Sequence, residues 1–244
     1  MTYDTENCTS RTVVVTHHRP PDIAPIGIAP PITSDPPFHH GVRRLILPAF
    51  APQAIDKLEP STRAYCQELI DQMGGRAEVD AAVEYAQHIP VRVIANMLGF
   101  PPEDGDKFRG FVDHALKDVA LPFEQRVVGM QALFEYLLAQ IQDHQANPRD
   151  DLTSYLLNTE LNGQPTDPGM VGGMIALLLI AGIDTTWSAI GASLWHLAKT
   201  PSDRERLVNE PELLPSAMEE FLRAYAPVTM ARLVKHDMEW EGCP

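Results

Sequence analysis

The longest apolar run in the sequence is the feature that most limits how the chain can fold. It covers Met170–Ile183, 14 residues that include three glycines. A membrane-spanning helix needs about 20 apolar residues, so we predict that this run belongs to a buried core helix. The helical pattern extends from Asp167 to Lys199, where Thr200 and Pro201 end it. A helix of this length would be the central element around which the others pack.

Composition and charge place the chain among ordinary globular proteins. Its 244 residues are enough for one large domain or two small ones, and 44% of them are hydrophobic. A formal net charge of -14 repels phosphate backbones and anionic lipid headgroups, so we expect no nucleic-acid partner and no membrane. Three cysteines without a paired framework, and an N-terminus without a secretory signal, favour a cytoplasmic location.

Helical periodicity dominates the sequence after a proline-rich N-terminal region. Ten of the 22 prolines precede residue 61, and residues 17–37 are expected to form an irregular loop. Apolar residues at three- and four-residue spacing then predict helices over 53–73, 90–98, 104–118, 123–145, 151–158, 167–199, 202–209 and 212–225. Short strands are expected after residue 226. We therefore predict a mainly α fold with small β segments, in one domain across residues 1–244.

An acid and two alcohols interrupt the apolar part of the long helix. In AGIDTT, Asp184 and Thr185 follow the small pair Ala181 and Gly182. A buried carboxylate and a glycine inside a helix each cost stability, and function is one reason to keep them. The small pair would let a ligand approach the backbone, while the acid and the alcohol could relay protons. The alternative is a structural bend in which a threonine hydroxyl bonds a carbonyl one turn back.

Two further motifs combine charged residues at helical spacing. Glu220 and Arg223 in EFLR are three apart and can pair on one helical face, a pattern that is usually a surface ion pair. In DPPFHHGVRR, His39 and Arg43 are four apart and would share a helical face suited to an anionic group. That segment could also be a solvated basic turn, or a histidine-pair metal site for which no third ligand is apparent.

Taken together, these motifs resemble the cytochrome P450 family of haem-thiolate monooxygenases, particularly its soluble bacterial members. DPPFHHGVRRLILPAF is similar to the family pattern DPPxHxxxRRLxxxAF, AGIDTT to A-G-x-[DE]-T-[TS], and EEFLR to E-x-x-R. The connecting segments PVRVIANMLGFPPED, SLWHLAKTPSDRERL and YAPVTMARLVKHDMEWEG are similar as well. The resemblance covers nearly everything from Ile32 to Pro244 and implies a partial cytochrome P450 domain.

The resemblance implies a haem b cofactor and names residues that would hold it. His39 and Arg43 would bind one haem propionate and Arg232 the other, each through a charge-assisted contact. Ala181 and Gly182 would lie against the haem itself. These assignments come from the matching positions of the family motifs.

The same resemblance gives the remaining motif residues their roles. Asp184 and Thr185 would be catalytic, guiding protons to dioxygen so that its O–O bond breaks. Glu220 and Arg223 would form a buried structural network behind the haem, in place of the surface pair that their spacing alone favours. Electrons would come from a ferredoxin or a flavoprotein.

A substrate pocket is expected beside the long helix. The residues that would line it are small or apolar, which favours a hydrophobic small molecule of modest size as the substrate. They are Leu177, Leu178, Val228, Thr229 and Met230.

The sequence departs from the family at the iron ligand. The family's cysteine lies in a later F-x-x-G-x-x-x-C-x-G loop, which these residues do not contain. Cys243 lacks the spacing of that loop, and Cys8 and Cys66 fit no better, so no metal ligand is assigned. Because the thiolate favours O–O cleavage, we expect these residues alone to be inactive, and the sequence looks truncated at both ends. The alternatives to a segment of an oxygenase are a non-catalytic truncated remnant and a ligand-binding helical module.

Overall fold

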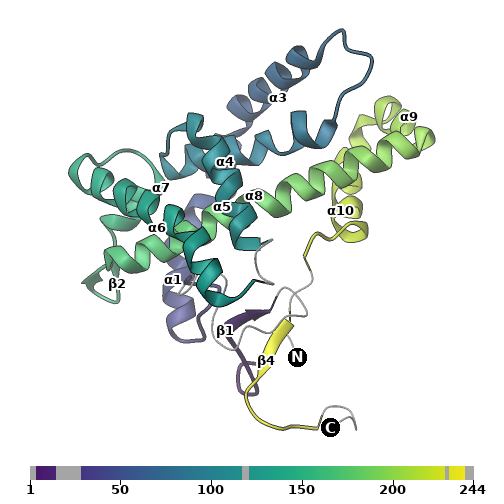
Figure 1. Cartoon of the computed structure of the whole chain (residues 1–244). Helices are drawn as coiled ribbons and strands as arrows, with labels where there is room; N and C mark the ends of the chain where they lie inside the picture. Colours follow the sequence, from purple (N-terminus) through teal and green to yellow (C-terminus); the bar gives the residue numbers. More distant parts are fainter. Residues whose placement is uncertain (1–3, 15–28, 117–120, 229–230, 240–244) are drawn as a thin grey trace.

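Helices make up most of the chain in a computed structural model that describes residues 4–14, 29–116, 121–228 and 231–239 (Figure 1). The helices are α1 (Phe38–Ile46), α2 (Pro52–Asp56), α3 (Glu59–Met73), α4 (His88–Leu98), α5 (Gly105–Leu116), α6 (Phe123–Ala146), α7 (Leu152–Leu157), α8 (Pro168–Lys199), α9 (Pro201–Asn209) and α10 (Leu214–Ala224). Short helical turns join them, namely η1 (Leu47–Phe50), η2 (Ala82–Ala86, a π-helical turn), η3 (Pro102–Asp104) and η5 (Pro211–Leu213). The strands are β1 (Cys8–Val14), β2 (Glu160–Leu161), β3 (Gln164–Pro165) and β4 (Ala231–Val234).

The predicted helices agree with this architecture, with one split. The helix expected over residues 53–73 is two helices, α2 and α3, because Pro60 begins a new helix in the first turn of α3. Strand β1 and the hairpin β2–β3 were not predicted. The hairpin turns through Asn162 and Gly163, whose φ angles of 56° and 77° suit a two-residue turn. The irregular loop expected over 17–37 lies largely outside the described residues.

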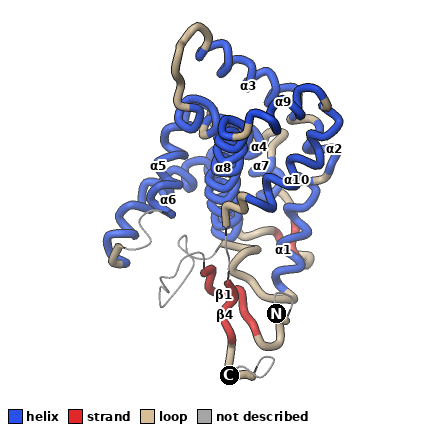
Figure 2. The backbone as a smooth tube through the Cα atoms, turned by 90° about the vertical axis from the view of Figure 1, so that its right-hand side faces the viewer, coloured by secondary structure: helices blue, strands red, loops and turns tan. Residues whose placement is uncertain are grey.

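Helix α8 has two different halves. The buried residues all lie between Val171 and Ile183, whereas none from Asp184 to Lys199 is buried. Among the described residues, α8 is the one helix long and apolar enough to cross a membrane, and its N-terminal half is instead packed among other helices. Viewed along α8 in Figure 2, α5 and α6 lie on one side, and the β1–β4 pair and α1 lie below it. The prediction of a buried core helix is confirmed for the first half only.

Two glycines bring neighbouring helices close to the buried half of α8. A Cβ on Gly182 would lie 3.1 Å from Cδ1 of Ile94 on α4, and a Cβ on Gly172 would lie 3.2 Å from Cδ1 of Ile141 on α6. Ile94 and Ile141 both belong to the apolar core. The glycines therefore set how closely α4 and α6 can pack on α8.

One carboxylate connects the small sheet to α1. Strand β1 pairs antiparallel with β4, with Cys8 opposite Val234, so distant parts of the sequence lie side by side. Asp35 accepts hydrogen bonds from Thr9 Oγ1 at 2.5 Å and from the Ser10 backbone N–H at 2.8 Å. Because Asp35 precedes α1 by three residues, these bonds place the start of α1 beside the sheet.

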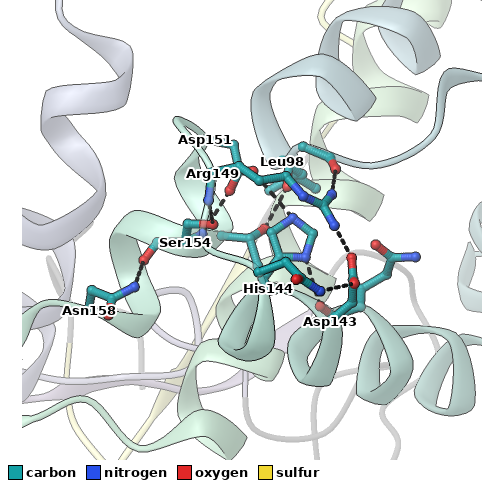
Figure 3. Close-up of polar contacts among 11 residues, drawn as sticks. Leu98, Asp143, His144, Arg149, Asp151, Ser154 and Asn158 are labelled. Atoms are coloured by element: carbon teal, nitrogen blue, oxygen red, sulfur yellow. Dashed lines mark hydrogen bonds and ion pairs between the residues drawn. The ribbon is translucent and has the colours of Figure 1, made fainter.

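A buried histidine joins α6 to α7 (Figure 3). The side chain of His144 has no exposed surface, and its Nδ1–H donates to the Gln140 carbonyl, 2.7 Å away. Its Nε2 lies 3.3 Å from Asp151 Oδ2. The other oxygen of Asp151 accepts the Ser154 N–H at 2.7 Å and so caps the N-terminus of α7. One oxygen of Asp151 is therefore held by a hydrogen bond, while Oδ2 and His144 Nε2 are buried without a hydrogen-bond partner among the described residues.

Gly99, which ends α4, is required by this arrangement. Its φ angle is 71°, in the left-handed region, and a Cβ on it would overlap the carboxylate of Asp151. Because the Ser154 N–H holds that carboxylate, it cannot easily move away.

We predict that Gly99→Ala lowers the free energy of unfolding by about 2–3 kcal/mol, from backbone strain and overlap. Gly110→Ala is the matched control, because Gly110 lies inside α5 with nothing within 4 Å of its missing Cβ. This control should raise stability by up to about 1 kcal/mol. Urea unfolding followed by circular dichroism measures both, and equal stability of the two variants would contradict the packing described for Asp151.

Candidate functional site

Helix α1 carries the basic residues predicted to bind an anionic group. Its buried face consists of Val42 and Ile46, while His39 is half-buried and Arg43 is exposed. His39 and Arg43 are one turn apart on α1, as their spacing predicts. No carboxylate in the described part of the chain pairs with Arg43, so its guanidinium can take an anionic partner.

The AGIDTT segment lies where the two halves of α8 meet. Ala181 is exposed, and Asp184 and Thr185 are half-buried. Thr185 Oγ1 donates to the Ala181 carbonyl at 2.9 Å, which is the local bond of the structural alternative, yet the helix continues without interruption. Asp184 is only partly buried, so the argument that a buried charge needs a functional reason does not hold at this position.

Gly182 faces the core rather than an open groove. Its missing Cβ leaves room for Ile94 of α4 at 3.1 Å. Neighbouring residues on a helix point about 100° apart, so Ala181 and Gly182 face different surroundings, and the expectation that they admit a ligand together stays a prediction. Ala181 alone presents a small side chain to the open side.

The Glu220–Arg223 pair forms but is not buried. Arg223 Nε and Nη2 donate to the two carboxylate oxygens of Glu220 at 2.7 and 2.6 Å. This hydrogen bonding lowers the pKa of Glu220 and raises that of Arg223. Their side chains remain 58% and 72% exposed, so the expected buried network is wrong for this structure. The reason is that α10 has no buried residue, which leaves the pair in solvent.

The remaining predicted residues are only partly placed. Leu177 and Leu178 are half-buried and pack against the apolar core, and Val228 is 39% exposed. Thr229 and Met230 lie outside the described residues. Arg232 belongs to β4, but its side chain is not described. The assignment of these positions to a substrate pocket and a propionate contact stays a prediction.

The elements that carry these residues share one side of the molecule. Both Figure 1 and Figure 2 place α1 and the β1–β4 pair below α8. Strand β4 follows α10 in the sequence, so the chain is back on that side after the half of α8 from Asp184 to Lys199. The convergence of the basic helix, the strand and the acid–alcohol pair of α8 on one region stays a prediction.

A separate hollow lies among α3, η2 and α4. It has a volume of about 610 Å³ and includes Tyr65, His88 and Arg92, with the Arg92 guanidinium 4.3 Å from the centre of the Tyr65 ring. Burial and the nearby Arg109 lower the pKa of His88. None of the residues predicted from the sequence lines this hollow.

Sequence reasoning missed a side-chain junction at the end of α8. His196 contacts Tyr225 and Asp203, which lie 29 and seven residues away. No local pattern reports a contact between a helix end and a residue two helices later, so the sequence held no signal for it.

The opposite environments of Ala181 and Gly182 give a direct prediction. Gly182→Leu should lower the free energy of unfolding by about 1–3 kcal/mol, because the new side chain meets Ile94. Ala181→Leu adds the same side chain on the exposed side and should change stability by less than about 0.5 kcal/mol. Urea unfolding of the two variants tests the difference, and equal losses would mean that α8 is rotated from the position described.

Sequence comparisons give relatives of one kind. No protein-family model matches the chain. Cytochrome P450 107B1 of Saccharopolyspora erythraea is 34% identical over 197 residues, which are 81% of this chain and 48% of that protein. The vitamin D(3) 25-hydroxylase of Pseudonocardia autotrophica is 34% identical over 214 residues, 86% of this chain and 53% of that protein.

Solved structures with the same fold agree. A mutant of P450 EryK in complex with erythromycin B has a TM-score of 0.84 and 28% identity, over 99% of this chain and 62% of that one. The myxobacterial cytochrome P450 CYP267B1 in complex with myristic acid has a TM-score of 0.80 and 32% identity, over 86% of this chain and 53% of that one. The mainly α fold class is thereby confirmed. The chain is a homologue of the bacterial cytochromes P450 and belongs to that family, and it spans about half the length of the curated relatives it matches.

Proposed function

We propose that residues 1–244 are the part of a cytochrome P450 domain that faces dioxygen and substrate in a haem-dependent monooxygenase. The observation that carries this is the position of Asp184 and Thr185 at the middle of α8, directly after its buried half ends at Ile183. The homology to bacterial P450s supports the reaction class, insertion of one oxygen atom into an organic substrate.

The proposed substrate is a hydrophobic small molecule. Support comes from the apolar, half-buried Leu177 and Leu178 on α8. It also comes from the relatives, which include a vitamin D(3) hydroxylase and a P450 solved with myristic acid. The electron donor is proposed to be a ferredoxin or a flavoprotein, and the location cytoplasmic, as inferred from the sequence.

The residues present fit a haem on its oxygen side and at one propionate. Arg43 is exposed without a carboxylate partner among the described residues, on a helix that also carries His39, His40 and Arg44. In a chain of net charge -14, such a basic helix is where an anionic propionate would be attracted. Ala181 adds a small side chain where a flat group could lie close to the backbone. Bound haem would supply the reduction of dioxygen and the oxygen transfer.

That none of the three cysteines supplies the thiolate ligand of the family stays a prediction. Cys66 lies on α3 and Cys8 is buried in β1, while Cys243 lies outside the described residues. The inactivity of these residues when they are isolated stays a prediction as well.

Thr185 and Asp184 have a defined task in this proposal. The Thr185 hydroxyl donates its hydrogen bond to the Ala181 carbonyl. Its oxygen can therefore still accept a hydrogen bond from a group on the open side. Asp184, the adjacent half-buried acid, can hold a proton and pass it towards that side. Together they would deliver protons to the region that Ala181 leaves open.

We predict that the 244-residue chain binds haem saturably, with a measurable change in the Soret band. Arg43→Gln should weaken this binding about three- to tenfold, because it removes one charge-assisted contact. Ala181→Leu should weaken it about tenfold by filling the space beside the helix.

Arg44→Gln is the matched control, since it removes the same charge from the same helix about 100° further round. It should leave the haem affinity unchanged. A Soret titration without saturation would contradict this haem site and favour the truncated, non-catalytic remnant. Equal losses for Arg43 and Arg44 would reduce their role to general electrostatic attraction.

A further inference from the structure

One histidine makes the hydrogen bond that attaches the α10 segment to α8. Helix α10 has no buried residue, and its apolar stripe remains exposed. In the described part of the chain, the hydrogen bond between Tyr225 and His196 is the only one that joins the α10 segment to α8. We propose that His196 is a positioning residue. It fixes α10, with its Glu220–Arg223 pair, relative to the half of α8 that begins at Asp184.

The hydrogen bonds of His196 define its role. Its Nε2 lies 2.8 Å from Asp203 Oδ2, and its Nδ1 lies 2.7 Å from the Tyr225 hydroxyl oxygen. A carboxylate can only accept, so Nε2 carries the hydrogen in the neutral ring, and Nδ1 then accepts the Tyr225 O–H. One imidazole therefore connects three elements: the end of α8, the start of α9 and the residue that follows α10.

Aromatic contacts surround the same ring. The His196 ring lies 5.2 Å from the ring of Phe221 on α10 and 5.7 Å from that of Tyr225, both edge to face. The Trp195 ring lies 6.2 Å from that of Tyr225. Edge-to-face contacts at such distances are favourable and directional, so they orient α10 as well as hold it.

His196 connects the helix that carries Thr185 to the helix that carries Glu220 and Arg223. His196 is three helical turns beyond Thr185 on the same unbroken helix, and Phe221 lies between Glu220 and Arg223 in sequence. A rotation of α10 about this junction would move the Glu220–Arg223 pair and the chain that leads into β4. The hydrogen bond to Asp203 orients the His196 ring, and the hydrogen bond from Tyr225 to that ring holds the end of α10.

Hydrogen exchange of the complete 244-residue chain tests the proposal. His196→Leu removes both hydrogen bonds and should raise exchange in residues 214–224 about tenfold, with α4 and the first half of α8 unchanged. His196→Gln should restore near wild-type exchange, because its amide keeps one acceptor for Tyr225 and one donor for Asp203. Tyr225→Phe, which removes only the hydroxyl, should give an increase of about threefold to tenfold.

His236→Leu is the control, because His236 is exposed and lies outside the junction. It should leave α10 exchange unchanged. Unchanged exchange of α10 in His196→Leu would overturn the proposal, and so would a His196→Gln variant as fast as His196→Leu. The inference rests on the proposed function only for the importance of α10. Because exchange is measured without haem, a failed haem titration would not change the result expected here.

Discussion

Gly182 allows α4 to approach α8 so closely that a Cβ at this position would lie 3.1 Å from Ile94. The core follows from this contact: α4 and α8 share the apolar cluster that also holds α5, α6 and α7. The carboxyl end of α4 is fixed in turn, because Gly99 fits beneath Asp151 and Asp151 caps α7. Close helix packing at one glycine and a tight turn at another thus position most of the helices.

The consequence for function is a division of α8 along its length. The buried residues of α8 all lie between Val171 and Ile183, where Ala181 is the exposed exception, and from Asp184 onward the helix has no buried residue. The acid–alcohol pair therefore begins the half that remains able to contact a ligand, an electron-transfer partner or the rest of a P450 domain. The rigid half holds it in place, which is what a proton-delivering group requires.

Local signals in the sequence predicted much of this structure. Asp151 and Asp167 precede helices and cap them, and the hydroxyl of Thr185 bonds one turn back as its residue type allows. The Asn162–Gly163 turn also carried a hairpin signal, although the hairpin was not predicted. By contrast, the exposure of Glu220 and the junction at His196 depend on which elements pack over α10. Tertiary packing of that kind leaves no trace in local spacing, and the family resemblance suggested burial that these residues do not produce.

The central claim, that α8 is buried on its core face and open at Ala181, is tested most directly by thiol labelling. Ala176→Cys and Ala181→Cys would be compared in a chain whose own cysteines are replaced by alanine. Ala176 is the buried position of the two, with only 2% of its surface exposed. The account predicts that the thiol at 181 reacts with a maleimide nearly as fast in buffer as in urea. The thiol at 176 should react at least about a hundredfold more slowly in buffer, because it becomes accessible only when the core opens. Equal rates at the two positions in buffer would contradict the account.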